Sequence, residues 1–203
     1  MFEERCKVLE PKTEKGRESL ERICLEAERL FAEKGYHATS IKEIMANANL
    51  GTGTFYIYFT DKLTLYKKLL TTYSHTIRRN IALKVETATT RKEAEKLGIL
   101  AYLETVAENP SIYNIIWESL YIERSLFDNY YKDFANSYIK QLEKAQFADE
   151  IEQDIDVELV AYMLIGISNF VGLRYAVFED NSQRFPEIAE EIVNILDAGL
   201  FKK

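Results

Sequence analysis

Apolar residues recur at intervals of three and four along almost the whole chain, the spacing that places them on one face of an α-helix. The first such segment ends at Gly35, a residue type that often terminates helices. Its apolar positions are Leu20, Ile23, Cys24, Ala27, Leu30 and Phe31. No stretch combines strict alternation of apolar and polar residues with two-residue hairpin signals, so the pattern predicts an all-α protein.

Two short helices are predicted to follow, separated by a tight turn. Ser40 and Glu43 have the spacing of a capping box, in which two side chains bond free backbone N–H groups at the start of a helix. Residues 47–51 (Asn-Ala-Asn-Leu-Gly) suit a turn, because asparagine tolerates a positive φ and glycine adopts it freely. A third helix is predicted over residues 52–58, so the second and third helices together form a helix-turn-helix.

The remaining helices are placed by capping residues and prolines. Gly51 stands where a side chain would normally cap the third helix, and Thr52 is expected to provide that cap instead. Thr60 or Asp61 can cap a longer fourth helix that begins near Lys62 and links a small head to a larger body. Further helices are predicted over about 91–108, 111–122, 126–147, 157–179 and 186–201, with Asn109-Pro110 and Phe185-Pro186 among the separating signals.

The composition is that of a folded, helix-rich protein without structural disulfides. Of its 203 residues, 47% are hydrophobic and 29% are charged. The cysteines are Cys6 and Cys24, and the second lies in the apolar stripe of the first helix, which indicates a small core residue in a reducing compartment. No signal peptide is recognisable, and the longest apolar run, residues 159–173, is shorter than the roughly 20 residues of a membrane span. We therefore expect a cytoplasmic protein without membrane contact.

The net charge of −7 conceals an uneven distribution along the chain. Residues 1–80 carry 14 Lys+Arg and 11 Asp+Glu, giving +3, whereas residues 81–203 carry 12 and 22, giving −10. A mildly basic end on an acidic body is expected when only one end of a protein meets phosphate groups. Chance differences between helix faces are the alternative explanation until the helix-turn-helix is considered.

The helix-turn-helix offers a set of contacts to DNA, with its second helix entering the major groove. Short residues at the start of that helix let the backbone approach DNA, and tyrosine hydroxyls can reach phosphates or base edges. Lys62 and Ser40 are expected to hold phosphates, and Lys42 to reach a base. Taken singly, such residues also fit ordinary surface or packing roles, and their joint spacing favours DNA binding. The predicted DNA-binding residues are Ser40, Lys42, Thr52, Gly53, Thr54, Tyr56, Tyr58 and Lys62, with Phe55 and Phe59 in the core.

The same residues resemble the N-terminal signature of the TetR family of bacterial regulators over about residues 19–66. The resemblance rests on Phe-Ala-Glu-Lys-Gly-Tyr at 31–36, Thr-Ser-Ile at 39–41, Gly-Thr-Phe-Tyr-Ile-Tyr-Phe at 53–59, and Lys62. Asn49 and Gly51 depart from the usual pattern, and the second departure leaves the base contacts open. The resemblance implies an all-helical homodimer that reads a pseudo-palindromic operator. It places an N-terminal arm and DNA-binding domain in residues 1–66 and an effector-binding and dimerisation domain in residues 67–203.

The second half of the chain is rich in aromatic residues, which suit either a core or an apolar ligand pocket. The candidates for an effector pocket are Tyr113, Trp117, Tyr121, Phe134, Tyr138 and Phe170, with Arg174 as an anchor for an anionic group. An apolar stripe on the last two helices, with Gly166 and Gly172 allowing close approach, is expected to pair with a second copy, although a buried core would show the same periodicity. The stripe comprises Val160, Leu164, Ile167, Val171, Ile188, Ile192, Ile195 and Leu196.

These features predict a DNA-binding repressor that a small apolar or amphipathic effector, for example an acyl thioester, releases from its operator. The alternative is an effector-independent architectural DNA-binding dimer that recruits a protein partner. The sequence shows no nucleophile–histidine–acid arrangement, phosphate-binding glycine loop or cluster of metal ligands around His37 or His75. We therefore predict no enzymatic activity, no cofactor and no metal.

Overall fold

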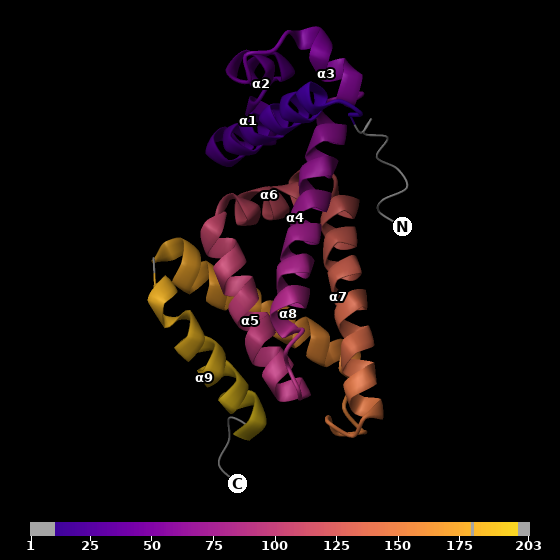
Figure 1. The fold of residues 1–203 in the computed structure, drawn as a ribbon, viewed down its shortest axis with the longest axis vertical. Coiled ribbons are helices and arrows are strands. Elements are labelled where there is room, and N and C mark those ends of the chain that lie inside the picture. Colours follow the sequence, from indigo (N-terminus) through magenta and orange to yellow (C-terminus); the bar gives the residue numbers. More distant parts are fainter. Residues whose placement is uncertain (1–10, 180, 199–203) are drawn as a thin grey trace. The chain divides into compact units, whose positions relative to one another are not determined.

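The computed structural model describes residues 11–179 and 181–198, and all regular secondary structure within them is helical, which confirms the predicted all-α fold (Figure 1). Cys6 lies outside the described residues. The elements are α1 (Glu14–Ala38), α2 (Ile41–Asn47), α3 (Thr52–Tyr58), α4 (Lys62–Val85), α5 (Arg91–Glu108), α6 (Ser111–Ile122), α7 (Arg124–Phe147), α8 (Val157–Gly172), the π-helix η2 (Leu173–Phe178), the 3₁₀ turn η3 (Ser182–Arg184) and α9 (Phe185–Ala198).

The described residues form two compact units that are interleaved in sequence. Unit 1 contains residues 11–74 and 111–130, which are α1, α2, α3, the first half of α4, α6 and the start of α7. Unit 2 contains the remainder of α4 and α7 together with α5, α8, η2 and α9. The α6 helix belongs to unit 1, where it packs against α1.

The α1 helix is capped at its start and sharply kinked near its end. The Thr13 hydroxyl accepts a hydrogen bond from the Gly16 N–H at 3.1 Å. Gly35 has φ +83° and ψ 164°, a combination essentially restricted to glycine, and this residue kinks the helix. A Cβ atom at Gly35 would lie 2.7 Å from Oε1 of Glu118 on α6. The same oxygen accepts a hydrogen bond from the Tyr36 N–H at 2.7 Å, so the kink is the point where α6 joins α1.

Aromatic packing fills the interior of unit 1. The ring of Tyr66 on α4 is buried, with its centroid 5.3 Å from that of Phe31 and 5.2 Å from that of Tyr36. Its hydroxyl donates to the carbonyl of Ile115 on α6 at 2.5 Å, which satisfies a polar group that would otherwise be costly to bury. Cys24 on α1 is a free thiol, and burial raises its pKa to about 12. It therefore stays protonated at neutral pH, as suits the predicted core residue.

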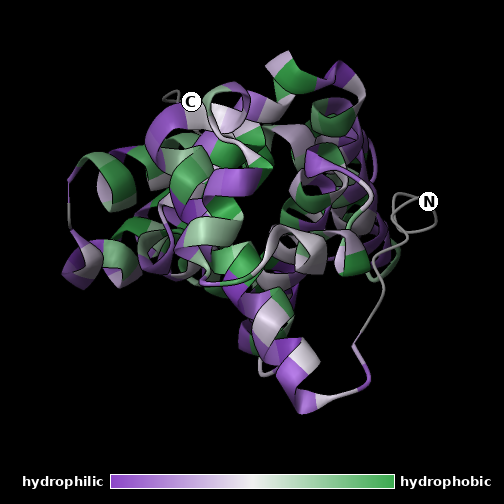
Figure 2. Cartoon of the chain, turned by 90° about the horizontal axis from the view of Figure 1, so that it is seen from above, coloured by the Kyte–Doolittle hydropathy of each residue, from purple (hydrophilic) through white to green (hydrophobic). Residues whose placement is uncertain are grey.

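The α8 helix continues directly into η2, where one helix over residues 157–179 was predicted. Figure 2 shows hydrophobic and hydrophilic residues interleaved along the helices, as expected when each helix buries one face. The combined segment Val157–Phe178 has 22 residues and contains an 18-residue window with a mean hydropathy of 1.4, enough by length and composition to cross a membrane, and 22% of that window is buried. The apolar run of residues 159–173 is only part of this helix, and several of its apolar side chains, among them Leu159, Met163 and Phe170, are exposed.

Two glycine-to-alanine substitutions are expected to have opposite effects on stability. Gly35→Ala should lower the free energy of unfolding by about 1–3 kcal/mol, because alanine is strained at this φ and ψ and its Cβ would clash with Glu118. Gly98→Ala in α5 should raise it by up to about 1 kcal/mol, because the added Cβ would lie no closer than 3.7 Å to Ile81 and alanine favours helices. Urea unfolding followed by far-UV circular dichroism measures both. A Gly35→Ala variant as stable as the wild type would contradict the strained conformation.

Candidate nucleic-acid interface and effector region

The start of α2 is capped as the sequence predicts, although only half of the capping box forms. The Ser40 hydroxyl accepts a hydrogen bond from the Glu43 N–H at 3.2 Å. The Glu43 carboxylate pairs instead with Lys34 of α1, and this ion pair holds the pKa of Glu43 below its usual value. The first helix of the helix-turn-helix is thus tied both to its own cap and to α1.

Arginines of α1 hold the turn between α2 and α3. Asn49 in this turn has φ +51°, which confirms the positive φ that the sequence indicates. The Arg22 guanidinium donates to the carbonyl of Ala48 and, at 3.4 Å, to that of Asn49, so it covers the C-terminal end of α2. Arg29 donates to the side-chain oxygen of Asn47 at 3.1 Å. Sequence analysis missed both arginines, because contacts over 18 to 27 residues leave no local pattern.

The start of α3 carries no side-chain cap. Its N-cap residue is Gly51, and no side chain bonds the first N–H groups of the helix. Thr52 is already within the helix, so the prediction that Thr52 provides the cap is wrong. Phe55 and Phe59 are fully buried, as predicted, and fix the orientation of α3. The uncapped N–H groups at the start of the helix are therefore free of competing side chains.

Six of the predicted DNA-binding residues lie at or near the surface of α2 and α3. Tyr56 is 60% exposed, and the backbone at Gly53 has open space where a Cβ would be. Short residues and an exposed tyrosine therefore line the outer side of α3, as direct contact with a DNA groove requires. We call these residues the nucleic-acid face: Ser40, Lys42, Thr52, Gly53 and Tyr56, which are exposed, and Thr54, which is half-buried.

Tyr58 does not belong to this face. It follows Phe55 by three residues, which places it on the buried side of α3, and its hydroxyl donates to the Gly16 carbonyl of α1 at 3.0 Å. The expectation that this hydroxyl reaches DNA is therefore corrected, since the side chain instead fastens α3 to the first turn of α1.

Lys62 is tied to the segment that connects α1 and α2. Its ammonium group donates to the carbonyls of Tyr36 at 2.5 Å and Thr39 at 2.6 Å, and lies 4.2 Å from the centroid of the Tyr36 ring. Burial lowers the pKa of Lys62, and the Glu118 carboxylate opposes this effect. Two of the three ammonium donors are thus used within unit 1, which leaves one for a phosphate.

A turn pinned by α1, followed by a short helix with a buried aromatic side and an exposed polar side, defines a helix-turn-helix DNA-binding protein. The family model described as bacterial regulatory proteins, tetR family, matches residues 23–69. Residues 23–69 thus match the DNA-binding domain of the TetR family, and the chain is a DNA-binding transcriptional regulator of the TetR type. It is 25% identical over 192 residues to the HTH-type transcriptional regulator YdgC of Bacillus subtilis, covering 93% of this chain and 96% of that protein.

Solved structures share the fold over nearly the full length. The fatty acid degradation regulator FadR from Bacillus halodurans matches with a TM-score of 0.79 and 20% identity, covering 96% of this chain and 100% of that one. FadR from Bacillus subtilis, solved in complex with stearoyl-CoA, matches with a TM-score of 0.70 and 21% identity, covering 89% and 99%. At these identities the similarity establishes a common fold.

The residues predicted to line an effector pocket are divided between the two units. In unit 1, Tyr113 is buried and packs edge-on against Trp117, with ring centroids 6.0 Å apart, whereas Tyr121 is 81% exposed. In unit 2, the exposed Arg174 pairs with Glu179 at 2.7 Å. Tyr121 and Arg174 therefore lie on the surface in this conformation, which does not match the expected pocket lining.

The other predicted pocket residues in unit 2 lie in surroundings that differ from one another. The Tyr138 hydroxyl donates to the Glu95 carboxylate, which pairs with Arg91, and burial raises the pKa of Tyr138 well above its usual value. Tyr138 is therefore part of a satisfied polar cluster between α5 and α7. Phe134 is half-buried on α7, and Phe170 is 67% exposed on α8.

A second polar cluster in unit 2 was missed by sequence analysis. The side-chain oxygen of Asn169 on α8 accepts hydrogen bonds from the hydroxyls of Tyr102 at 3.1 Å and Tyr131 at 3.4 Å. Its amide nitrogen donates to the carbonyl of Ile165 at 2.8 Å. Three helices, α5, α7 and α8, thus direct polar groups to one point. In the sequence Asn169 is only an interruption of an apolar run, and nothing local identifies its partners.

Tyr56→Phe is expected to weaken binding to a specific duplex from the upstream region of the gene by about fivefold to tenfold, the loss of one polar contact. The fold should not change, because the Tyr56 side chain is largely exposed. Tyr121→Phe, an equally conservative change at an exposed site on α6, serves as the control and should bind like the wild type. Fluorescence anisotropy titrations measure the affinities. If the wild type and both variants bind with equal affinity, the assignment of the Tyr56 hydroxyl as a DNA contact is contradicted.

Proposed function

We propose that the protein is a cytoplasmic homodimeric repressor that leaves its operator when a long-chain acyl thioester binds to unit 2. The observation that carries the proposal is the near full-length fold similarity to two fatty-acid regulators, one of them solved with stearoyl-CoA. The nucleic-acid face supplies the operator contacts. Binding of operator and effector to different conformations of the dimer would couple the two sites.

The cluster at Asn169 is the proposed polar end of the effector site. Ligand sites in helical domains are mostly apolar, with a few polar groups that orient the ligand. The hydroxyls of Tyr102 and Tyr131 and the amide of Asn169 are such groups, contributed by three helices whose other inward residues are largely apolar. Each hydroxyl donates its one hydrogen to Asn169 in this structure, so a bound thioester carbonyl would accept one of these hydrogen bonds in place of Asn169, while the acyl chain lies along the apolar side chains.

The proposed dimer face lies on the exposed side of α8. Leu164 was predicted to belong to the dimer stripe, but it is buried inside unit 2. Its helical spacing therefore reflects packing in the core of that unit. The opposite side exposes Leu159, Met163 and Phe170, which follow one another at helical spacing. Gly166 lies on the same side with open space around it, so a second copy of α8 can approach closely, as the sequence indicates for this glycine.

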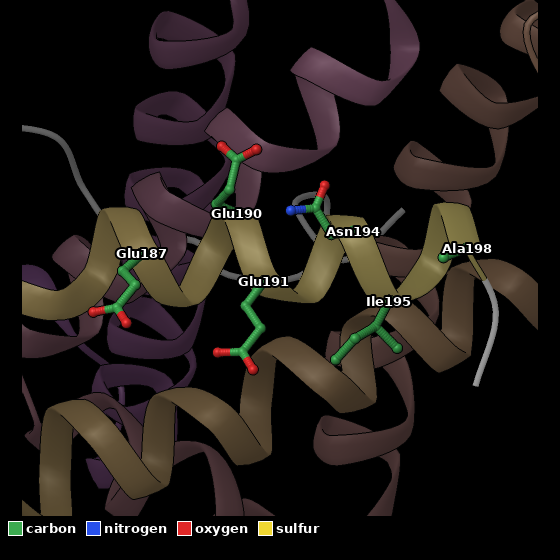
Figure 3. A pocket seen from close by; sticks show the side chains of 6 residues that line it. All are labelled: Glu187, Glu190, Glu191, Asn194, Ile195 and Ala198. Atoms are coloured by element: carbon green, nitrogen blue, oxygen red, sulfur yellow. The ribbon is translucent and has the colours of Figure 1, made fainter. Parts of the chain in front are cut away.

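The α9 helix contributes to the same face. Ile195 and Leu196 are exposed, whereas Ile188 is buried, so only the end of the predicted stripe on α9 is at the surface. A groove of about 410 Å³ runs along α9, lined by Glu187, Glu190, Glu191, Asn194, Ile195 and Ala198. Figure 3 shows Glu190 pointing away from the side of α9 that carries Glu191 and Ile195. The glutamates that line this groove would repel the phosphates of an acyl-CoA. We therefore assign the groove to the dimer face and not to the effector site.

Stearoyl-CoA is expected to release the wild-type protein from its upstream duplex. Asn169→Ala should raise the concentration needed for half-release about tenfold, because the tyrosine hydroxyls lose their common partner. Asn136→Ala, at an exposed position on α7, is the control and should respond like the wild type. Anisotropy titrations with stearoyl-CoA and free stearate measure release. Specific DNA binding that no acyl-CoA alters would favour the architectural alternative without an effector.

Phe170→Glu is expected to convert the dimer to a monomer, because it places a charge in the apolar face on α8. Phe147→Glu, at a 94% exposed position on α7 outside that face, should leave the dimer intact. Sedimentation velocity gives the mass of each protein in solution. A dimeric Phe170→Glu variant, or a monomeric wild type, would contradict this assignment of the dimer face.

A further inference from the structure

We propose that Lys12 and Lys15, at the start of α1, contact the phosphate backbone of the operator beside the groove that α3 enters. The inference rests on the proposed operator binding and extends it to a second element. It concerns the short charged segment before α1, which the nucleic-acid face does not include.

The first turn of α1 is attached directly to the recognition helix. Tyr58, the last residue of α3, donates its hydroxyl hydrogen to the carbonyl of Gly16 at 3.0 Å. A Cβ at Gly16 would lie 3.5 Å from the same hydroxyl oxygen, an ordinary contact distance, so the Tyr58 side chain lies directly against the first turn of α1. The start of α1 therefore lies beside the C-terminal end of α3, in the same unit as the nucleic-acid face.

The segment that carries the two lysines is ordered before DNA binds. Thr13 caps α1 through the Gly16 N–H, and the Thr13 carbonyl accepts a hydrogen bond from the Arg17 N–H at 3.0 Å. Pro11 folds back over Gly16, where an added Cβ would lie 2.8 Å from the Pro11 Cβ. Because this segment is already ordered, DNA binding loses less conformational entropy than it would if the segment were flexible.

Lys15 faces the side of α1 that holds the helix-turn-helix, and Lys12 lies one residue before the Thr13 cap of this helix. Lys15 precedes Arg22 by seven residues and Arg29 by fourteen, so the three share one side of the helix. Arg22 and Arg29 bind the turn between α2 and α3 from that side. The acidic residues of the same stretch, Glu14, Glu18 and Glu21, follow one another at spacings of four and three and lie on another side.

Both lysines are also available for an anion. Lys12 and Lys15 are exposed, and neither ammonium group makes an ion pair or hydrogen bond among the described residues. Several other cations of unit 1 are engaged: Arg29 with Glu26 and Glu33, Lys34 with Glu43, Lys67 with Glu123, Arg22 and Lys62 with carbonyls. A lysine ammonium next to a DNA groove binds phosphate as a point charge and adds affinity without reading bases.

The test compares the wild type with the double variant Lys12→Gln/Lys15→Gln on the same upstream duplex over a series of salt concentrations. Each lost phosphate contact reduces the slope of log affinity against log salt by about 0.9, so a dimer that loses four contacts should lose roughly 3 to 4. The ratio of specific to non-specific affinity should change little. Lys12→Arg/Lys15→Arg should restore the wild-type slope.

A matched control removes the same charge elsewhere. Lys132→Gln/Lys140→Gln changes two exposed lysines on α7 in unit 2 and should keep the wild-type slope. If the Lys12/Lys15 double variant has the wild-type slope, or the same slope as this control, the inference is overturned while operator binding stands. Loss of sequence preference in the double variant would also overturn the inference, because contacts to the phosphate backbone do not distinguish one DNA sequence from another. A wild type that binds no upstream duplex would overturn both this inference and the proposed function.

Discussion

The backbone between Gly35 and Thr39 is held by charged groups from two other helices, and the placement of α2 and α3 depends on it. Glu118 of α6 accepts the Tyr36 N–H, and Lys62 of α4 donates to the carbonyls of Tyr36 and Thr39. Gly35 permits this arrangement because it alone tolerates both the backbone conformation and the nearby carboxylate. Buried polar contacts of this kind are costly to break, so they define one direction for the chain as it enters the helix-turn-helix.

Local patterns were sufficient to predict the helices and several of their caps. Ser40 caps α2, Asn49 adopts a positive φ, and Asp61 accepts the Thr64 N–H at the start of α4, each within three or four residues of its own element. The failures also have local reasons. Thr52 cannot cap α3 once it is itself helical, and periodicity alone identifies the faces of α8 without showing that Leu164 faces inward.

The helix-turn-helix was easier to predict than the surroundings of the proposed effector residues, because one short motif contains it. Even there, the hydrogen bonds of Tyr58 and Lys62 were beyond sequence reasoning, since their partners lie 23 to 42 residues away. The effector region has no such motif. An aromatic residue in a helical protein suits a core, a surface or a ligand site, and only the convergence of α5, α7 and α8 distinguishes Asn169 from other polar residues.

The inclusion of α6 in unit 1 bears on how such regulators can diversify. A recombination event that exchanged the first 66 residues for those of another regulator would separate Tyr66 from Ile115 and Tyr36 from Glu118. The new head would meet an α6 selected to fit a different partner. Exchange of DNA specificity between relatives therefore requires either point substitutions on the outer side of α3 or the joint inheritance of two separated stretches of the gene.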